Sequence, residues 1–397
     1  MRLLPALFLC LALPAHAETL SQEIGRTGLA ATGARLAALP ARSDADSFAL
    51  GGVQFLRAIE GTFQERWALG LTDRTGMLPL LRLPLSDNPA PSPFEPHAIV
   101  EIFTHAADRL HDAQLRLTAI PESSHFGLEI ALDDIWFDVD SDRARGPGEG
   151  IGAILGATLA GTTDPTDTAP PPLPTIRFDV ADAAWLAAYA DLLGGICAMV
   201  QAYDPTEPIT RVMSARAAME QLGPVQADPF FGGSSNPDVF DMIAMVLATL
   251  NQTPDTGRMA QAKQHFRYMI AENRLFWTRV ARESDNDREW LPNEAQQSAL
   301  GVSVPQGTGP AWLAVLSDLD AALTGQKLVP YWRVGGSVGV NLGAMFDDPR
   351  PIDLAGWVQG WAALPYLEQG PLLDTLALDA FDQLTSGQAP LFALYLN

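Results

Sequence analysis

Residues 182–203, which read DAAWLAAYADLLGGICAMVQAY, form the most strongly patterned stretch of the chain. Large apolar side chains recur there every three or four positions, which is the spacing of one broad face of an α-helix. This face consists of Trp185, Leu186, Tyr189, Leu192, Leu193, Ile196, Val200 and Tyr203. A helix with such a broad apolar face packs against several neighbours. The stretch therefore predicts a core built mainly from helices.

Helical periodicity continues on both sides of this stretch. We expect further helices over residues 20–39, 43–69, 96–117, 208–222, 237–250, 256–282, 310–323, 352–364 and 371–384. Apolar and polar residues alternate at 128–133 instead, which indicates a short strand. No period of about 20 to 50 residues recurs, so a regular helical repeat is not expected. The predicted fold is mainly α, an irregular multi-helix array with a minor β element near residues 126–137.

Two segments of unusual composition predict how the chain is organised. Residues 1–17 have a charged start, an apolar run and a small-x-small cleavage pattern, which is typical of a secretory signal peptide. Residues 161–175 are rich in Pro and Thr, which is typical of a linker. We therefore expect an N-terminal helical subdomain at 18–160 with a first acidic loop, and a C-terminal helical domain at 176–397 with a second.

The charge of the chain is strongly acidic. Removal of residues 1–17 takes away one Arg and leaves 24 basic and 47 acidic residues, a formal charge of −23 (24 − 47). Such a surface repels nucleic acids and anionic lipids, whereas a cationic or protein partner is compatible with it. No later apolar run reaches the length of a membrane span without a break. The leader and this composition predict a soluble periplasmic or secreted protein. Cys197 would be its one cysteine, so no intramolecular disulfide is expected.

Residues 138–149, which read DVDSDRARGPGE, gather carboxylates at alternating positions. Asp138, Asp140, Asp142 and Glu149 stand at positions 1, 3, 5 and 12 of this window. Near a protein surface, neighbouring carboxylates repel one another by about 1 to 3 kcal/mol, so the group needs a counter-charge or full solvation. The window resembles the calcium loop of EF-hand and dockerin proteins. This resemblance implies that the four side chains bind Ca²⁺ and that Ala144, at position 7, offers its carbonyl.

Two residues of this window depart from the EF-hand pattern. Arg143 occupies position 6, where Gly is usual because the loop turns through positive φ, and a residue with a side chain costs roughly 1 kcal/mol there. Gly146, at position 9, has no side chain to offer, so water would fill that corner. A second interpretation therefore stays open, in which Arg143 and Arg145 neutralise a solvated acidic turn.

A second window, residues 283–294, repeats the spacing of the first. It reads ESDNDREWLPNE and places Glu283, Asp285, Asp287 and Glu294 at positions 1, 3, 5 and 12. The same resemblance implies a second calcium site, although the long side chain of Glu283 is a poorer first ligand than Asp. The alternative is a polar loop that follows a helix.

One motif favours an enzyme. Residues 335–339 match Gly-x-Ser-x-Gly, with Ser337 in the place of a nucleophile. The last histidine, His265, precedes this serine, whereas an α/β-hydrolase requires its His after the Ser. We therefore assign no catalytic residues, and expect an exported helical protein with EF-hand-like calcium loops and a binding or structural role. The alternative is an extracytoplasmic hydrolase that acts on a polymer such as a glycan or peptide.

Overall fold

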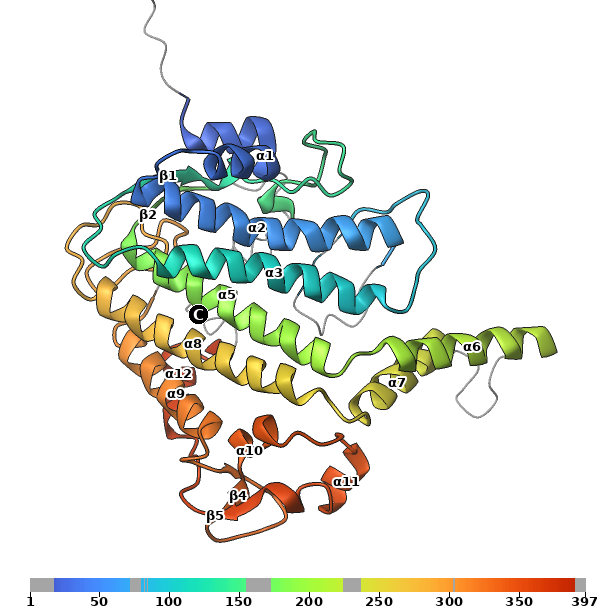
Figure 1. The fold of residues 1–397 in the computed structure, drawn as a ribbon. Helices are drawn as coiled ribbons and strands as arrows, with labels where there is room; N and C mark the ends of the chain where they lie inside the picture. The colour runs from blue at the N-terminus through green and yellow to red at the C-terminus, as the bar shows by residue number, and fades with distance from the viewer. Residues whose placement is uncertain are drawn as a thin grey trace, which may run out of the picture.

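The structure, a computed structural model, describes residues 18–71, 80–81, 83, 85–154, 173–223, 237–302 and 304–389. Helices dominate this part of the chain, and its strands are short and antiparallel (Figure 1). The predicted mainly α fold is confirmed. The predicted signal peptide and residues 161–172 of the predicted linker lie outside the described residues.

Four long helices lie side by side and form the main layer (Figure 1). They are α2 (Asp44–Leu69), α3 (Ala98–Thr118), α5 (Val180–Ala202) and α8 (Thr256–Val280). Helix α2 starts at a capping box, in which Ser43 and Asp46 each accept a hydrogen bond from the other's backbone N–H. Helix α5 packs between α3 and α8, and a Cβ atom on its Gly195 would lie 2.6 Å from the ring of Phe266. The glycine thus lets α5 and α8 approach closely.

Helix α5 is also long and apolar enough to cross a membrane. In this structure 67% of that apolar segment is buried inside the protein. Its broad apolar face therefore serves the core here, as the periodicity of residues 182–203 predicts.

The remaining helices surround this layer (Figure 1). Helix α1 (Leu20–Ala37) covers α2, while α9 (Thr308–Leu323) and α12 (Leu376–Leu384) lie beyond α8. Helices α6 (Thr206–Leu222) and α7 (Pro237–Leu250) project from one end of the layer. The helix predicted at 352–364 is shorter, because α11 (Leu354–Gln359) ends at Gly360, whose φ is 122°. The helix predicted at 371–384 starts late, because Leu372 forms a bridge with Leu328.

A two-stranded sheet joins segments that are distant in the sequence. Strand β1 (Leu128–Ala131) pairs antiparallel with β2 (Thr175–Phe178), and the short helix η1 (Leu132–Asp134) follows β1. This confirms the minor β element predicted near 126–137. Phe103 of α3 and Ala190 of α5 also belong to one apolar cluster, so segments on both sides of the expected linker share a core.

The last part of the described chain forms a small sheet with short helices around it. Strand β4 (Val338–Val340) pairs with β3 (Val329–Pro330) and with β5 (Leu367–Gln369), and α10 (Leu342–Asp347) and η2 (Leu364–Tyr366) lie beside them. Ser337 therefore lies between two antiparallel strands, where its carbonyl accepts a hydrogen bond from Gly370 N–H at 2.8 Å. A nucleophile elbow requires a strand followed by a helix, and this motif is a strand-to-strand turn.

Candidate metal centre

The two ends of the first acidic loop are held together by backbone hydrogen bonds. Phe137 N–H donates to the carbonyl of Glu149 at 2.9 Å, and Ile151 N–H donates to the carbonyl of Ile135 at 2.9 Å. The side chains of Ile135, Phe137 and Ile151 belong to the apolar cluster beneath the loop. Positions 1 and 12 of the loop are therefore brought together by the core.

Three of the predicted ligands converge. One oxygen from each of Asp138, Asp140 and Glu149 lies within 4.8 Å of the others, so this group can hold a metal ion. Asp138 and Glu149 are each 8% exposed, whereas Asp140 is exposed to solvent. The donor set consists of carboxylate oxygens, which are hard ligands suited to Ca²⁺, Mg²⁺ or Mn²⁺.

Backbone N–H groups fix the positions of these carboxylates. Asp138 Oδ1 accepts from Arg143 N–H at 3.2 Å, and the two oxygens of Glu149 accept from Val139 N–H at 2.9 Å and Gly146 N–H at 2.6 Å. A carboxylate offers about four acceptor sites. Each group can therefore be oriented by the loop and still coordinate a cation.

Helix α2 supports the loop from the core side. Glu60 Oε1 accepts a hydrogen bond from Asp138 N–H at 2.9 Å, and Gln64 Nε2 donates to the Asp138 carbonyl at 2.8 Å. Glu60 is only 1% exposed, and this burial raises the pKa of its carboxyl, against the lowering effects of the Asp138 N–H and of the Arg57 guanidinium at 2.6 Å. Both the N–H and the carbonyl of Asp138 are thus held by hydrogen bonds to side chains of α2.

Asp142, the fourth side chain predicted as a ligand, lies outside this cluster. Arg143 has φ of 66°, which is the left-handed conformation expected at position 6. Asp142 is exposed, and its Oδ1 accepts from Ala144 N–H at 2.7 Å, so it closes a local turn. Neither Arg143 nor Arg145 forms an ion pair with any carboxylate of the described chain.

The four predicted ligands of the second loop do not come together. Asp285 and Asp287 face the guanidinium of Arg177, at 3.4 and 3.6 Å. Glu294 points elsewhere and accepts a hydrogen bond from Gly307 N–H, immediately before α9, at 3.0 Å. Within the ranges that the structure describes, no three carboxylates of this loop form a group that can hold an ion.

Glu283 of the second loop lies instead among acids from other segments. Burial raises the pKa of Glu283 to about 7, and the nearby charge of Asp179 adds to this, while a hydrogen bond from Gln296 at 3.1 Å opposes it. Burial likewise raises the pKa values of Asp182 and Glu289. Burial therefore disfavours, at this place, the ionised carboxylates that a metal site requires.

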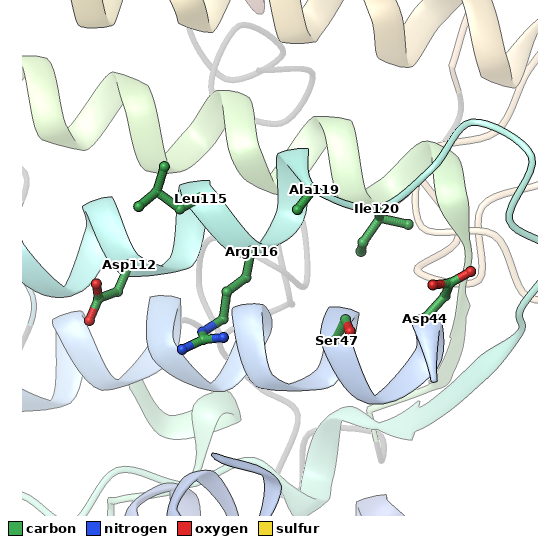
Figure 2. Close-up of a pocket in the computed structure, with 7 residues that line it drawn as sticks. All are labelled: Asp44, Ser47, Asp112, Leu115, Arg116, Ala119 and Ile120. Atoms are coloured by element: carbon green, nitrogen blue, oxygen red, sulfur yellow. The ribbon is translucent and has the colours of Figure 1, made fainter. Parts of the chain in front are cut away.

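A surface hollow of about 320 Å³ lies apart from the acidic loop, between the start of α2 and the end of α3 (Figure 2). Figure 2 shows the Arg116 side chain extending from α3 toward α2, with Asp112 on one side of it and Asp44 on the other. Leu115 and Ile120 contribute apolar surface. None of the predicted metal ligands lines this hollow, so it is separate from the metal centre.

The chain was compared with models of protein families, with curated proteins and with solved structures, and none of the three comparisons finds a match. The functional argument therefore depends on the residues and their geometry.

Proposed function

We propose that this chain is an exported helical protein with a binding or structural role, in which the loop 138–149 binds Ca²⁺. The observation that carries the proposal is the convergence of Asp138, Asp140 and Glu149 on a loop whose ends are closed by the core. Export is supported by the leader-like composition of residues 1–17. An exported chain that lacks a disulfide would gain rigidity from a bound ion.

The chemistry of the loop favours Ca²⁺ over other cations. The three converging groups are carboxylates, and no His or Cys belongs to the cluster, which disfavours Zn²⁺ and Cu²⁺. Mg²⁺ requires a near-ideal octahedral shell, whereas Ca²⁺ accepts irregular shells of six to eight oxygens that include water. The exposed Asp140 allows the ion to enter from solvent, together with the waters that complete such a shell.

A cation that binds the folded chain stabilises it by mass action. At a free concentration one hundred times its Kd, the expected gain is about 2.7 kcal/mol. We therefore expect calcium to raise the Tm of the wild-type protein relative to a sample in chelator. Magnesium at the same concentration should raise it less.

Two carboxylate-to-amide variants test whether the effect comes from this loop. Asp140→Asn and Glu149→Gln should each remove most of the calcium-dependent shift, because each replaces a charged ligand with a neutral amide. Glu294→Gln is the matched control, since the second loop does not assemble, and it should keep the full shift. The proposal fails if calcium leaves the Tm of the wild-type protein unchanged, or if all three variants respond as the wild type does.

A further inference from the structure

Helices α6 and α7 form an arm that extends away from the main layer (Figure 1). Where the two helices face each other, they enclose a pocket of about 200 Å³. Its lining consists of Val212, Met213 and Arg216 of α6 and Asp241, Met242 and Met245 of α7. Half of these residues are methionines, whereas the whole chain has 10 methionines among 397 residues. The arm therefore gathers thioether groups at one place.

An ion pair fixes the register of the two helices around these methionines. Arg216 of α6 lies 3.3 Å from Asp241 of α7. Met213 stands one turn before Arg216, and Met242 directly follows Asp241. Met245 stands three residues after Met242, so the two lie on one face of α7. One thioether thus reaches the pocket from α6, and two reach it from the facing helix.

The size of the pocket allows the three sulfur atoms to meet at one centre. A pocket of about 200 Å³ has room for only a few water molecules. Methionine is unbranched and has three rotatable side-chain bonds, so each thioether can turn toward the middle of such a space. Met213 is 38% exposed, which gives an ion access from solvent.

Packing alone does not account for methionine at these positions. Ordering a Met side chain costs about 1.5–2 kcal/mol of rotamer entropy, against about 0.5–1 kcal/mol for Leu. Leu fills a similar volume and has a similar helix propensity, so it would pack here at a lower cost. The property that Met has and Leu lacks is its sulfur atom.

The chemistry of the pocket favours a soft ion with a single charge. Thioethers are soft, neutral ligands that suit Cu(I), whereas Zn²⁺ is usually bound by Cys, His or carboxylates. Neither His nor Cys is among the residues of the described chain that line the pocket. Beside it, Arg216 pairs with Glu220 at 3.2 Å as well as with Asp241, so these three groups carry a net charge of −1 (1 − 2). One positive charge in the pocket would balance them.

We propose that the pocket between α6 and α7 is a binding site for Cu(I), with the sulfur atoms of Met213, Met242 and Met245 as its ligands. The bound ion joins the two helices of the arm. This site is independent of the acidic loop 138–149, whose carboxylate oxygens suit Ca²⁺.

Competition for Cu(I) against the chromophoric chelator bicinchoninate, without oxygen and with ascorbate present, tests this inference on the full-length chain. We expect the wild-type protein to take up one equivalent of Cu(I). Met213→Leu and Met242→Leu should each weaken binding by roughly 100-fold or more, because changes even outside a ligand set cost about 10- to 100-fold in metal affinity. Both variants conserve volume and helix propensity, so circular dichroism should report an unchanged helix content.

Met219→Leu is the matched control. Met219 belongs to α6, is 59% exposed and does not line the pocket, so this variant should bind Cu(I) as tightly as the wild type does. X-ray absorption at the copper edge should report a shell of sulfur atoms, and an excess of Ca²⁺ should leave the uptake unchanged. A wild-type protein that takes up no Cu(I), or a shell of nitrogen and oxygen atoms, overturns the inference. Equal binding by all three variants also overturns it, because the metal would then lie on other groups, such as the Cys197 thiol.

Discussion

Burial raises the pKa of Glu283 to about 7 from an ordinary value of 4.5. The fold thus favours its protonated form, so its contribution to stability is complete below pH 4.5 and is lost as the pH rises to about 7. The pKa difference would be worth about 3 kcal/mol for a fully buried group, and partial exposure reduces this to about 1–2 kcal/mol. Glu283→Gln should therefore raise the free energy of unfolding by that amount at pH 8.

Urea unfolding at a series of pH values measures this effect. The difference in stability between Glu283→Gln and the wild type should grow from pH 4.5 to 7 and then level off. A constant difference in stability between Glu283→Gln and the wild type across this range would contradict the raised pKa of Glu283.

Gly28 combines a positive φ with a close approach to a buried side chain. Its φ of 79° and ψ of 174° suit only glycine, and a Cβ atom would lie 2.9 Å from the buried ring of Trp136. Backbone strain and overpacking together predict that Gly28→Ala lowers the free energy of unfolding by about 2–4 kcal/mol. Gly148→Ala is the control, because it shares the positive φ but meets no atom within 4 Å, and it should cost only about 1 kcal/mol. Equal losses in urea unfolding would contradict the role of the Trp136 contact.

Some residues of the metal centre could be predicted from the sequence, and others could not. Asp138, Asp140 and Glu149 could be predicted because ligand spacing within one loop is a local property. Glu60 and Gln64 could not, because their bonds to Asp138 span 78 and 74 residues. A carboxylate between the apolar residues of α2 is a signal of a buried partner, but it does not say which one. The second loop repeats the ligand spacing, but its acidic side chains do not converge, because Glu294 accepts a hydrogen bond from Gly307 N–H instead.

At the scale of elements, two adjacent glycines of α2 give a matched test of packing against α3. A Cβ atom on Gly51 would lie 2.8 Å from Cγ of the buried Leu117, whereas one on Gly52 would make only an ordinary contact at 3.8 Å with Leu186. Gly52→Ala should stabilise the protein by about 0.5–1 kcal/mol through helix propensity. Gly51→Ala should destabilise it by about 1–2 kcal/mol, since overpacking outweighs propensity. Urea unfolding of the two variants should give opposite signs, and the same sign would show that α3 yields to the added methyl group.

The long helices could be predicted closely because each has an apolar periodicity within its own sequence, and α2, α5 and α8 also begin at a side-chain cap. The short elements near the C-terminal end could not, because their bounds depend on distant pairing. Leu372 joins Leu328 instead of starting a helix, and Gly360 stops α11 early. Periodicity therefore predicts the position of a helix better than its ends.

At the scale of the whole molecule, Trp290 joins two parts of the core. It packs against the apolar cluster beneath the acidic loop and against the cluster that lines α8 and α9. Its ring lies 6.2 Å from that of Phe178, in β2, and 5.4 Å from that of Trp185, in α5. The segments before and after the expected linker are therefore coupled through this side chain as well as through the β1–β2 pair.

Removing the Trp290 ring should accordingly weaken the molecule as a unit. Trp290→Ala should lower the free energy of unfolding by about 2–4 kcal/mol, less than for a fully buried tryptophan because the ring is half-buried. Trp332→Ala makes the same change at a ring that is 72% exposed, and should cost about 0.5 kcal/mol or less. Circular dichroism and tryptophan fluorescence should report coincident urea transitions for the wild type, because both clusters unfold together. Equal losses for the two variants, or wild-type transitions that separate by probe, would mean that the two clusters are stable independently and that Trp290 does not couple them.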